Sequence, residues 1–408
     1  MRIATSSIYD TGVSQLNSLQ SKMARTQQQI AANRRMLAPS DDPIASARAL
    51  EVTQSKSVNT QYGVNRQSAR ADLSEFELSL ASTTRLVQEM QAVAIKAGNG
   101  ILTAADRESM AVELSGHLEE LFGVANSSDG SGNFMFGGFQ TGTAPFVRTA
   151  GSANYVGDQG QRQLQVSSSR QMPVGAPGSE VFENNKTGNG TFVTSAFGAN
   201  TGSGIVSSGS VTNRAALTGH QYEITFAVAG TPAATTYSVL DKATGLPPAG
   251  LSGPQPFKPD QEIAFDGLSF SVKGAPAAGD KVGIDPSARQ SLFKTVNDLI
   301  TTLRSPTAVP GQQAALSNGL SKANENLAAA LDNVLSVRSS VGSRMVELDT
   351  LDSNGTDLDI QYESTLSNLQ DLDLVAAITS YSKQQQALEA AQKSFKSLTG
   401  LSLFNYIG

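Results

Sequence analysis

Few side chains in this sequence of 408 residues could carry out chemistry. The sequence contains no cysteine and only two histidines, His117 and His220. Thiol catalysis, disulfide scaffolds and cysteine-ligated metal sites are therefore excluded, and a nucleophilic triad would have to use one of the two histidines. The segment His117-Leu118-Glu119-Glu120-Leu121 lacks the glutamate directly after the histidine and the second histidine of a zinc-protease helix. We expect no catalytic residue, no metal site and no cofactor.

Two neighbouring aspartates, Asp41 and Asp42, could act as an acid and base pair, but a proline follows them. Aspartate accepts hydrogen bonds from the unpaired N–H groups at the start of a helix, and proline is favoured at the first helical position because it needs no donor there. We therefore interpret this segment as a structural cap motif. Its residues are Pro39, Ser40, Asp41, Asp42 and Pro43.

Two further polar segments have structural interpretations. Asp129-Gly130-Ser131-Gly132-Asn133 has part of a calcium-loop pattern but lacks the downstream glutamate and two of the usual acidic positions, so we expect a turn. His220 follows Gly219 at the start of a predicted strand, where we expect it to be exposed to solvent.

Charge and hydropathy exclude other classes of protein. The charged fraction is 16% and the formal net charge is -6, which argues against a nucleic-acid partner or a basic membrane-binding patch. No segment approaches the roughly 18 apolar residues that a membrane-spanning helix needs. Residues 1–8 lack the apolar region of a signal peptide, so we expect a cytoplasmic protein or one exported without such a peptide.

The positions of the prolines predict the architecture. Eleven of the 15 prolines lie between Pro145 and Pro286, whereas none lies between residues 44 and 144 or after Pro310. Because proline breaks helices, the two flanks are free to form long helices and the centre is not. We predict an α+β multidomain protein in which the two flanks form a long helical coiled coil or bundle around an inserted all-β domain. The predicted domains are terminal helices at 1–40 and 366–408, a helical bundle at 41–141 and 286–365, and a β-rich outer domain at 142–285.

The flanks carry apolar residues at alternating spacings of three and four, which is typical of a coiled-coil seam. We predict helices over residues 44–96, over 103–125 with a cap at Thr103, from Asp285-Pro286 onward, and over 312–352. The first of these carries Leu73, Phe76, Leu80, Thr83, Val87, Met90 and Ala94, and the last carries Leu320, Ala323, Leu327, Ala330, Val334, Val341, Met345 and Leu348. Each stripe has to be buried, so the two flanks are expected to pack together.

The two ends of the chain show a thinner heptad pattern. One row is apolar at each end, while the row four residues further on is mostly polar, with Gln20, Gln27, Gln385 and Gln392. Such seams bury too little to offset the entropy of ordering the backbone, so we predict ends that are disordered in the monomer and helical in an assembly. The predicted interface residues are Tyr9, Val13, Leu16, Met23, Ile30 and Leu37 in the N-terminal helix, and Leu374, Ile378, Tyr381, Leu388 and Phe395 in the C-terminal helix.

Three short segments carry a family resemblance. The block at residues 33–48, Asn-Arg-Arg-Met-Leu-Ala-Pro-Ser-Asp-Asp-Pro-Ile-Ala-Ser-Ala-Arg, resembles the N-terminal block of the flagellin superfamily, in the form typical of its junction proteins. Flagellins themselves usually have a Lys-Asp-Asp-Ala-Ala-Gly type of sequence here. The segments at 134–146 and 397–407 are similar to the junction proteins as well. The resemblance covers about residues 1–146 and 284–408.

The resemblance implies a structural role and no enzyme activity. Junction proteins of this superfamily are exported unfolded by the flagellar type III apparatus and assemble outside the cell between hook and filament. The implied partners are hook-associated protein 1, flagellin, further copies of this chain in a ring-like homo-oligomer, and an export chaperone. The chaperone would bind the amphipathic segment at 366–398 by a helix-in-groove contact.

Two other functions remain open at this stage. A flagellin-type filament subunit would share every bulk feature and would differ in the short motifs. A secreted binding protein or enzyme could use the β domain as its active module, but residues 145–285 offer few ionisable side chains for a convergent polar site.

Overall fold

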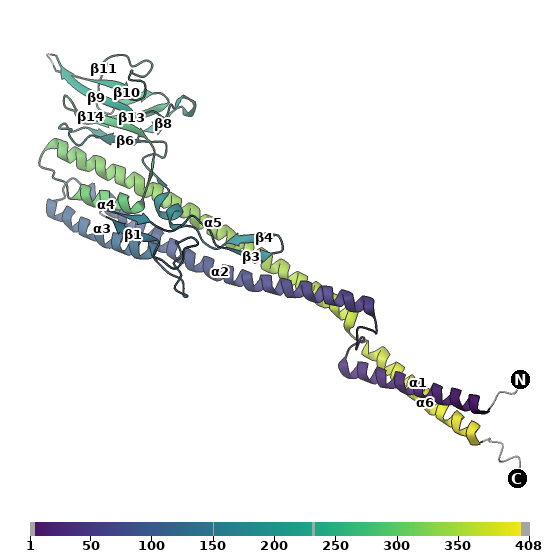
Figure 1. Cartoon of the computed structure of the whole chain (residues 1–408). Helices are drawn as coiled ribbons and strands as arrows, with labels where there is room; N and C mark the ends of the chain where they lie inside the picture. Colours follow the sequence, from purple (N-terminus) through teal and green to yellow (C-terminus); the bar gives the residue numbers. More distant parts are fainter. Residues whose placement is uncertain (1–4, 150, 231–232, 401–408) are drawn as a thin grey trace, which may run out of the picture. The chain divides into compact units, whose positions relative to one another are not determined.

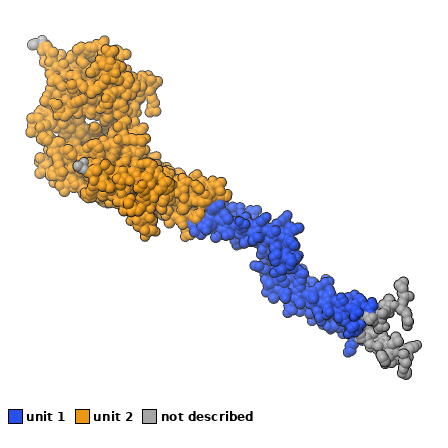
Figure 2. Space-filling view, in the orientation of Figure 1, with its two compact units in different colours: residues 1–64, 350–408 blue, residues 65–349 orange. Residues whose placement is uncertain are grey.

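The computed structural model describes residues 5–149, 151–230 and 233–400. The chain divides into two compact units, a terminal unit of residues 1–64 and 350–408, and a large unit of residues 65–349 (Figure 2). The boundary falls within two long helices, α2 (Pro43–Ala97) and α5 (Pro310–Gln370). The C-terminal motif at 397–407 extends beyond the described residues.

The terminal unit is mainly helical in its described part. Helices α1 (Thr5–Ala32) and α6 (Leu374–Gly400) lie side by side (Figure 1). Helix α1 ends at Asn33, whose φ of 51° lies in the left-handed region that asparagine tolerates better than most residues. Helix α6 begins after Asp373, whose Oδ1 accepts a hydrogen bond from the N–H of Ala376 at 2.9 Å.

The large unit is built on the two predicted stripes, which are buried. In α2, the residues from Leu73 to Ala94 that form the predicted stripe are at most 3% exposed. Thr83 is the one polar residue of this stripe. Its buried hydroxyl is satisfied because it donates a hydrogen bond to the carbonyl of Ser79 at 2.9 Å. In α5, Leu327, Ala330 and Val334 are fully buried. The helical part of the fold prediction is therefore confirmed.

Two shorter helices complete the helical layer, and one of them starts later than predicted. Helix α3 (Ala104–Ala125) begins with the predicted cap, in which Thr103 and Asp106 form a reciprocal capping box. Helix α4 is Leu292–Leu303, with Ser291 at its N-cap position. The prediction that Asp285-Pro286 opens this helix is wrong, because both residues belong to a strand and pair with Val193 and Phe192. The long-range strand pairing overrides the local capping preference.

The central residues form a β-sandwich. One sheet has the strand order β11-β10-β9-β14-β6, and the other has β12-β13-β7 with β8 also paired to β13. The strands of the first sheet are β6 (Phe192–Ala196), β9 (Tyr222–Ala229), β10 (Ala234–Asp241), β11 (Gln255–Pro256) and β14 (Lys281–Pro286). Those of the second are β7 (Ile205–Val206), β8 (Ser210–Val211), β12 (Glu262–Phe265) and β13 (Leu268–Lys273).

The two sheets share one apolar core. Tyr222, Ile224 and Phe226 of β9 alternate inward and belong to the same buried cluster as residues of the second sheet such as Phe265 and Phe270. This period of two is the pattern that the sequence shows. The inserted β region is therefore confirmed as part of the α+β fold.

The chain between α3 and the sandwich packs on the helices. It contains two hairpins, one strand that pairs with a strand following the sandwich, and a single π-helical turn, η1 (Ser179–Glu183). The pairs join β1 (Phe146–Thr149) to β2 (Ser152–Tyr155), β3 (Gln163–Ser167) to β4 (Arg170–Pro173), and β5 (Asn185–Lys186) to β15 (Arg289–Gln290). Phe182 of η1 stacks edge-on against Phe136 and Phe146 and lies 5.8 Å from the ring of Phe293 in α4. The three predicted domain limits stay a prediction.

Candidate functional site

The helix pair α1 and α6 contains most of the predicted interface residues. Val13, Leu16, Met23 and Ile30 of α1 are half-buried. On α6, Leu388 is 8% exposed, and Tyr381 and Phe395 are half-buried. The structure therefore brings together one apolar row from each end of the chain.

The two helices are in close contact near the chain ends. The rings of Tyr9 and Phe395 lie 5.2 Å apart. A Cβ atom at Gly12 would lie 2.7 Å from Cδ2 of Phe395, so glycine is the residue that lets this ring approach α1. No pattern in the sequence indicated this role, although Gly12 is the only glycine in α1.

The second row of the seam differs from the expected one. On α1 the residues facing the seam include Gly12, Leu19 and Thr26, and on α6 they include Ala377, Gln384 and Ala391. These rows lie three residues after the apolar rows. The expected rows, four residues after them, contain Gln20, Gln27, Gln385 and Gln392, and all four are exposed. The physical reason is that mostly small residues in the second row let the helices approach, whereas a glutamine row would hold them apart.

A hydrogen bond connects the two helices at mid-length. The hydroxyl of Thr26, which is 8% exposed, lies 3.2 Å from Oε1 of Gln384. The same hydroxyl also lies 3.0 Å from the carbonyl of Lys22 in its own helix. The centre of the seam is thus polar, which lowers the apolar area that the pair buries.

Several apolar side chains of the terminal unit stay uncovered. Leu374, Val375 and Ile378 lie close together at the start of α6 and are 43%, 78% and 53% exposed. Tyr9 and Leu37 are 53% and 39% exposed. Exposed clusters of large apolar residues are typical of surfaces that contact another molecule. Leu374 and Ile378 are therefore left largely uncovered by the rest of the chain, and their predicted role at an interface stays a prediction.

The segment between α1 and α2 contacts the segment between α5 and α6. Polar contacts join these two non-helical segments. The N–H of Arg35 donates to the carbonyl of Gln370 at 2.8 Å, and its guanidinium donates to the carbonyl of Leu369 at 2.8 Å. Arg34 and Asp371 form an isolated β-bridge. Arg35 lies within the block that carries the family resemblance, yet its role depends on residues more than 330 positions away, which a single sequence does not reveal.

The aspartates of the predicted cap motif accept backbone hydrogen bonds. Helix α2 begins at Pro43, and Oδ1 of Asp42 accepts a hydrogen bond from the N–H of Ala45 at 3.0 Å. Asp41 closes the preceding loop, because its Oδ2 accepts from the N–H groups of Leu37 and Ala38 at 3.0 and 3.2 Å.

The Asp41 carboxylate also forms an ion pair with α1. Its Oδ1 lies 2.6 Å from the guanidinium of Arg25. The two backbone hydrogen bonds, and then this arginine, hold the pKa of Asp41 below its ordinary value of 3.8. The motif therefore has a structural role, and Asp41 links the loop to the terminal helix.

Beyond the cap, α2 and α5 pair within the terminal unit through small and polar residues. The side-chain amide of Asn59 donates to the carbonyl of Gly355 at 2.8 Å and to Oδ1 of Asp359 at 3.3 Å. Lys56 and Glu363 form an ion pair at 2.7 Å. The pairing of α2 with α5 therefore includes specific polar contacts in the terminal unit.

His117, Asp129 and His220, which were considered for catalysis or metal binding, each contact other residues of the chain. His117 lies 3.7 Å from Glu89, and Oδ1 of Asp129 accepts from the N–H groups of Ser131 and Asn133, as expected for a turn. His220 is half-buried and lies 2.8 Å from Asp241, so the expectation of an exposed side chain is wrong. The cause is the pairing of β9 with β10, which places Tyr222 opposite Asp241. His220 lies two residues before Tyr222 and is therefore close to Asp241.

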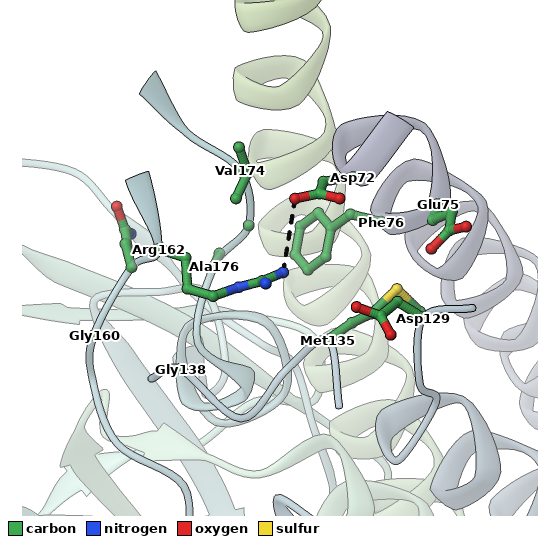
Figure 3. A pocket seen from close by; sticks show the side chains of 12 residues that line it. Asp72, Glu75, Phe76, Asp129, Met135, Gly138, Gly160, Arg162, Val174 and Ala176 are labelled. Carbon is green, nitrogen blue, oxygen red and sulfur yellow. Dashed lines mark ion pairs between the residues drawn. The ribbon is translucent and has the colours of Figure 1, made fainter. Parts of the chain in front are cut away.

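One acidic cavity of the large unit resembles a binding site but has little room. Asp72, Glu75, Asp129 and Arg162 line it, and Asp72 lies 3.8 Å from Arg162 (Figure 3). Burial raises the pKa of Asp72. The cavity measures about 20 Å³, which is room for one water molecule. Within 5–149, 151–230 and 233–400, no three histidine or acidic residues are grouped so as to hold a metal ion, and no helix is long and apolar enough to cross a membrane.

Comparison with known proteins identifies similar chains. The family model named bacterial flagellin N-terminal helical region matches residues 3–141 of this chain. The chain is 28% identical over 407 residues to flagellar hook-associated protein 3 of Salmonella typhimurium, and the match covers 99% of each chain.

Solved structures are similar over most of the chain. The flagellar junction protein FlgL from Legionella pneumophila is 30% identical with a TM-score of 0.72, over 79% of this chain and 100% of that one. FlgL from Xanthomonas campestris is 29% identical with a TM-score of 0.70, over 78% of this chain and 99% of that one.

Proposed function

The chain belongs to the flagellar hook-associated protein 3 family, and from this membership we propose that it is a structural subunit of the junction between the hook and the filament of the bacterial flagellum. The names of its relatives are those of flagellar hook-associated and junction proteins, which supports a structural role without catalysis. The chain would act outside the cell after export by the flagellar type III apparatus.

The terminal helices are the proposed assembly element. The observation that carries this proposal is the apolar surface left on the paired helices, where Leu374, Val375 and Ile378 are each more than 40% exposed. In an assembly, neighbouring subunits would cover this surface, and the burial would add to a seam that is thin and partly polar. The ends would then order fully only when they pack among other subunits.

The proposed partners are hook-associated protein 1 on one side, flagellin on the other, and further copies of this chain in a ring-like homo-oligomer. Each would meet an exposed surface of the subunit. The inserted β region would lie on the outside of the assembly, as the family resemblance implies.

An export chaperone is the further proposed partner, on the segment at 366–398. Leu388 and Tyr381 face α1, whereas Leu374 and Ile378 face outward. A chaperone groove that takes all four residues would have to replace α1. Chaperone binding and α1–α6 pairing would thus exclude each other, which would keep the ends apart before export.

The decisive genetic test is a strain that lacks this chain. It should release flagellin into the medium and carry hooks without filaments, and expression of the chain should restore filaments. Normal filaments on the deletion strain would overturn the proposed function.

A filament subunit is the second candidate, because the flagellin N-terminal model matches residues 3–141. A filament protein would polymerise alone into long filaments when added to seeds, whereas a junction subunit would add only a short zone. A secreted binding protein or enzyme that uses the β region is the remaining alternative.

A further inference from the structure

An open polar groove crosses the large unit where α5, η1 and the β5–β15 pair meet. It has two compartments with volumes of about 670 and 640 Å³, and Asn184 and Arg289 line both of them. Volumes of a few hundred to about 1,000 Å³ are typical of ligand sites. The compartments share these two residues, so they lie next to each other along the groove.

The walls of the groove are held firmly. The side-chain amide of Asn333 in α5 donates to the carbonyls of Glu180 and Val181 at 2.8 and 3.1 Å, which fixes the π-helical turn η1 against the helix. The ring of Phe182 anchors the same turn among buried aromatic residues. Single π-helical turns are rare and often occur at functional sites. The groove is therefore formed before any ligand binds, which lowers the entropy cost of binding.

Several hydrogen-bonding groups along the groove are not used by the protein. Across the residues that the structure describes, the side chains of Asn184, Lys186, Arg289 and Asp332 have no hydrogen-bond or ion-pair partner. The hydroxyl of Ser291, which also lines the groove, is likewise unpaired. These groups include both donors and acceptors, so a ligand that offers both would satisfy them.

The lining excludes most ligand classes. It has no aromatic residue and no large aliphatic one, so an apolar ligand or a protein segment with apolar anchors would find no pocket. Four carboxylates, those of Glu180, Glu183, Glu325 and Asp332, disfavour an anion. The cations Lys186 and Arg289 near the middle disfavour a polycation.

We propose that this groove binds a neutral carbohydrate chain. Hydroxyl groups both donate and accept, carry no charge, and match a row of amides, carboxylates and an arginine. The two compartments favour an oligosaccharide over a single sugar. Because no aromatic side chain offers a stacking surface, binding at each site is weak. In the proposed ring, several copies would bind at once, and this multivalency would raise the overall affinity.

The first test uses the full-length chain and neutral oligosaccharides of glucose, galactose and N-acetylglucosamine in saturation-transfer NMR and calorimetry. At least one neutral oligosaccharide should bind. Arg289→Ala and Asp332→Ala should each weaken binding about tenfold, as expected for a lost hydrogen bond to a charged group. Both residues are exposed, so thermal unfolding should stay unchanged in both variants.

Arg214→Ala is the matched control, because Arg214 is exposed on the 3₁₀ turn η2 (Arg214–Ala216) and does not line the groove. It should bind as the parent chain does. Binding that persists unchanged in Arg289→Ala and Asp332→Ala would overturn the proposal, and so would tighter binding of sulfated or phosphorylated sugars than of their neutral counterparts.

A second arm distinguishes the source of the sugar. Glycosylated flagellar filaments and the same filaments after chemical deglycosylation are immobilised and exposed to the chain. Binding that is lost on deglycosylation assigns the groove to a glycan on a neighbouring flagellar protein, whereas binding of free oligosaccharides alone assigns it to soluble or cell-surface glycan. Failure of every oligosaccharide and every filament to bind would refute the proposal, and the deletion strain would still test the junction role.

Discussion

Gln384→Leu should strengthen the pairing of the terminal helices. Gln384 lies half-buried in the α1–α6 seam, where its Oε1 accepts a hydrogen bond from Thr26 at 3.2 Å. After the substitution, the Thr26 hydroxyl still donates a hydrogen bond to the carbonyl of Lys22. No buried donor therefore becomes unpaired.

The magnitude follows from the position of residue 384. Full burial of a leucine side chain stabilises by about 1.5–3 kcal/mol, so half-burial contributes about 0.8–1.5 kcal/mol. The lost hydrogen bond offsets about 0.5 kcal/mol of this. The net gain is therefore at most about 1 kcal/mol, which corresponds to an equilibrium constant for pairing that is up to about fivefold larger.

Amide hydrogen exchange of the free subunit, read by mass spectrometry over α1 and α6, measures this change. Exchange should slow by up to about fivefold in both helices, and the helical circular dichroism signal should rise. Gln385→Leu is the matched control, since it makes the same chemical change one residue further on at an exposed position. Equal or stronger slowing in Gln385→Leu, or none in Gln384→Leu, would refute the seam described here.

Three further outcomes are expected. In the free parent chain, exchange should be fast over residues 10–35 and 370–398, and strong protection there would contradict ordering on assembly. Leu327→Ala removes a fully buried side chain of α5 and should cost about 2–5 kcal/mol, seen as a lower melting temperature, with no change of exchange in α1. Because the pKa of Asp41 is lowered in the folded chain, its contribution to the loop is present at neutral pH and is lost as the pH falls below 3.8. Asp41→Asn should abolish that acid dependence of exchange at Leu37 and Ala38, and an unchanged acid dependence would count against the assignment.

Local signals made much of the helical architecture predictable. Thr103 and Asp106, like Asp42 and Pro43, are helix-start signals that act within a few residues, and the structure has both helix starts. The stripe from Leu73 to Ala94 has a period that only a helix buries on one side.

Long-range pairing explains where sequence reasoning failed. Asp285 and Pro286 have the local pattern of a helix start, yet β14 pairs them with β6, which is about 90 residues away. His220 is half-buried because β9 pairs with β10. The strand order of the sandwich depends on such pairings throughout, and no local pattern encodes them.

The candidate site was predictable in part. The apolar rows at both chain ends follow from spacing alone, but the second row depends on how closely the helices approach. Gly12 and Ala377 permit that close approach, so the second row of the seam lies three residues after the apolar row. The contacts of Arg35 with Gln370 join distant segments and have no local signal.

The surface at the start of α6 can be changed without disturbing the α1–α6 seam. Ile378→Ser should leave that seam intact, because the Ile378 side chain is 53% exposed. The matched control is Val112→Ser on α3 of the large unit, since it changes a side chain of similar type that is 59% exposed. Both variants place a serine within a helix, so any loss of helix propensity is shared between them.

The most direct test of the assembly claim adds purified chain to isolated hooks that carry hook-associated protein 1, followed by flagellin, and records growth by electron microscopy. We expect the parent chain and Val112→Ser each to add a short zone that supports filament growth, and Ile378→Ser to add little. Long filaments of this chain alone, or addition of Ile378→Ser equal to that of the parent, would contradict the assembly claim.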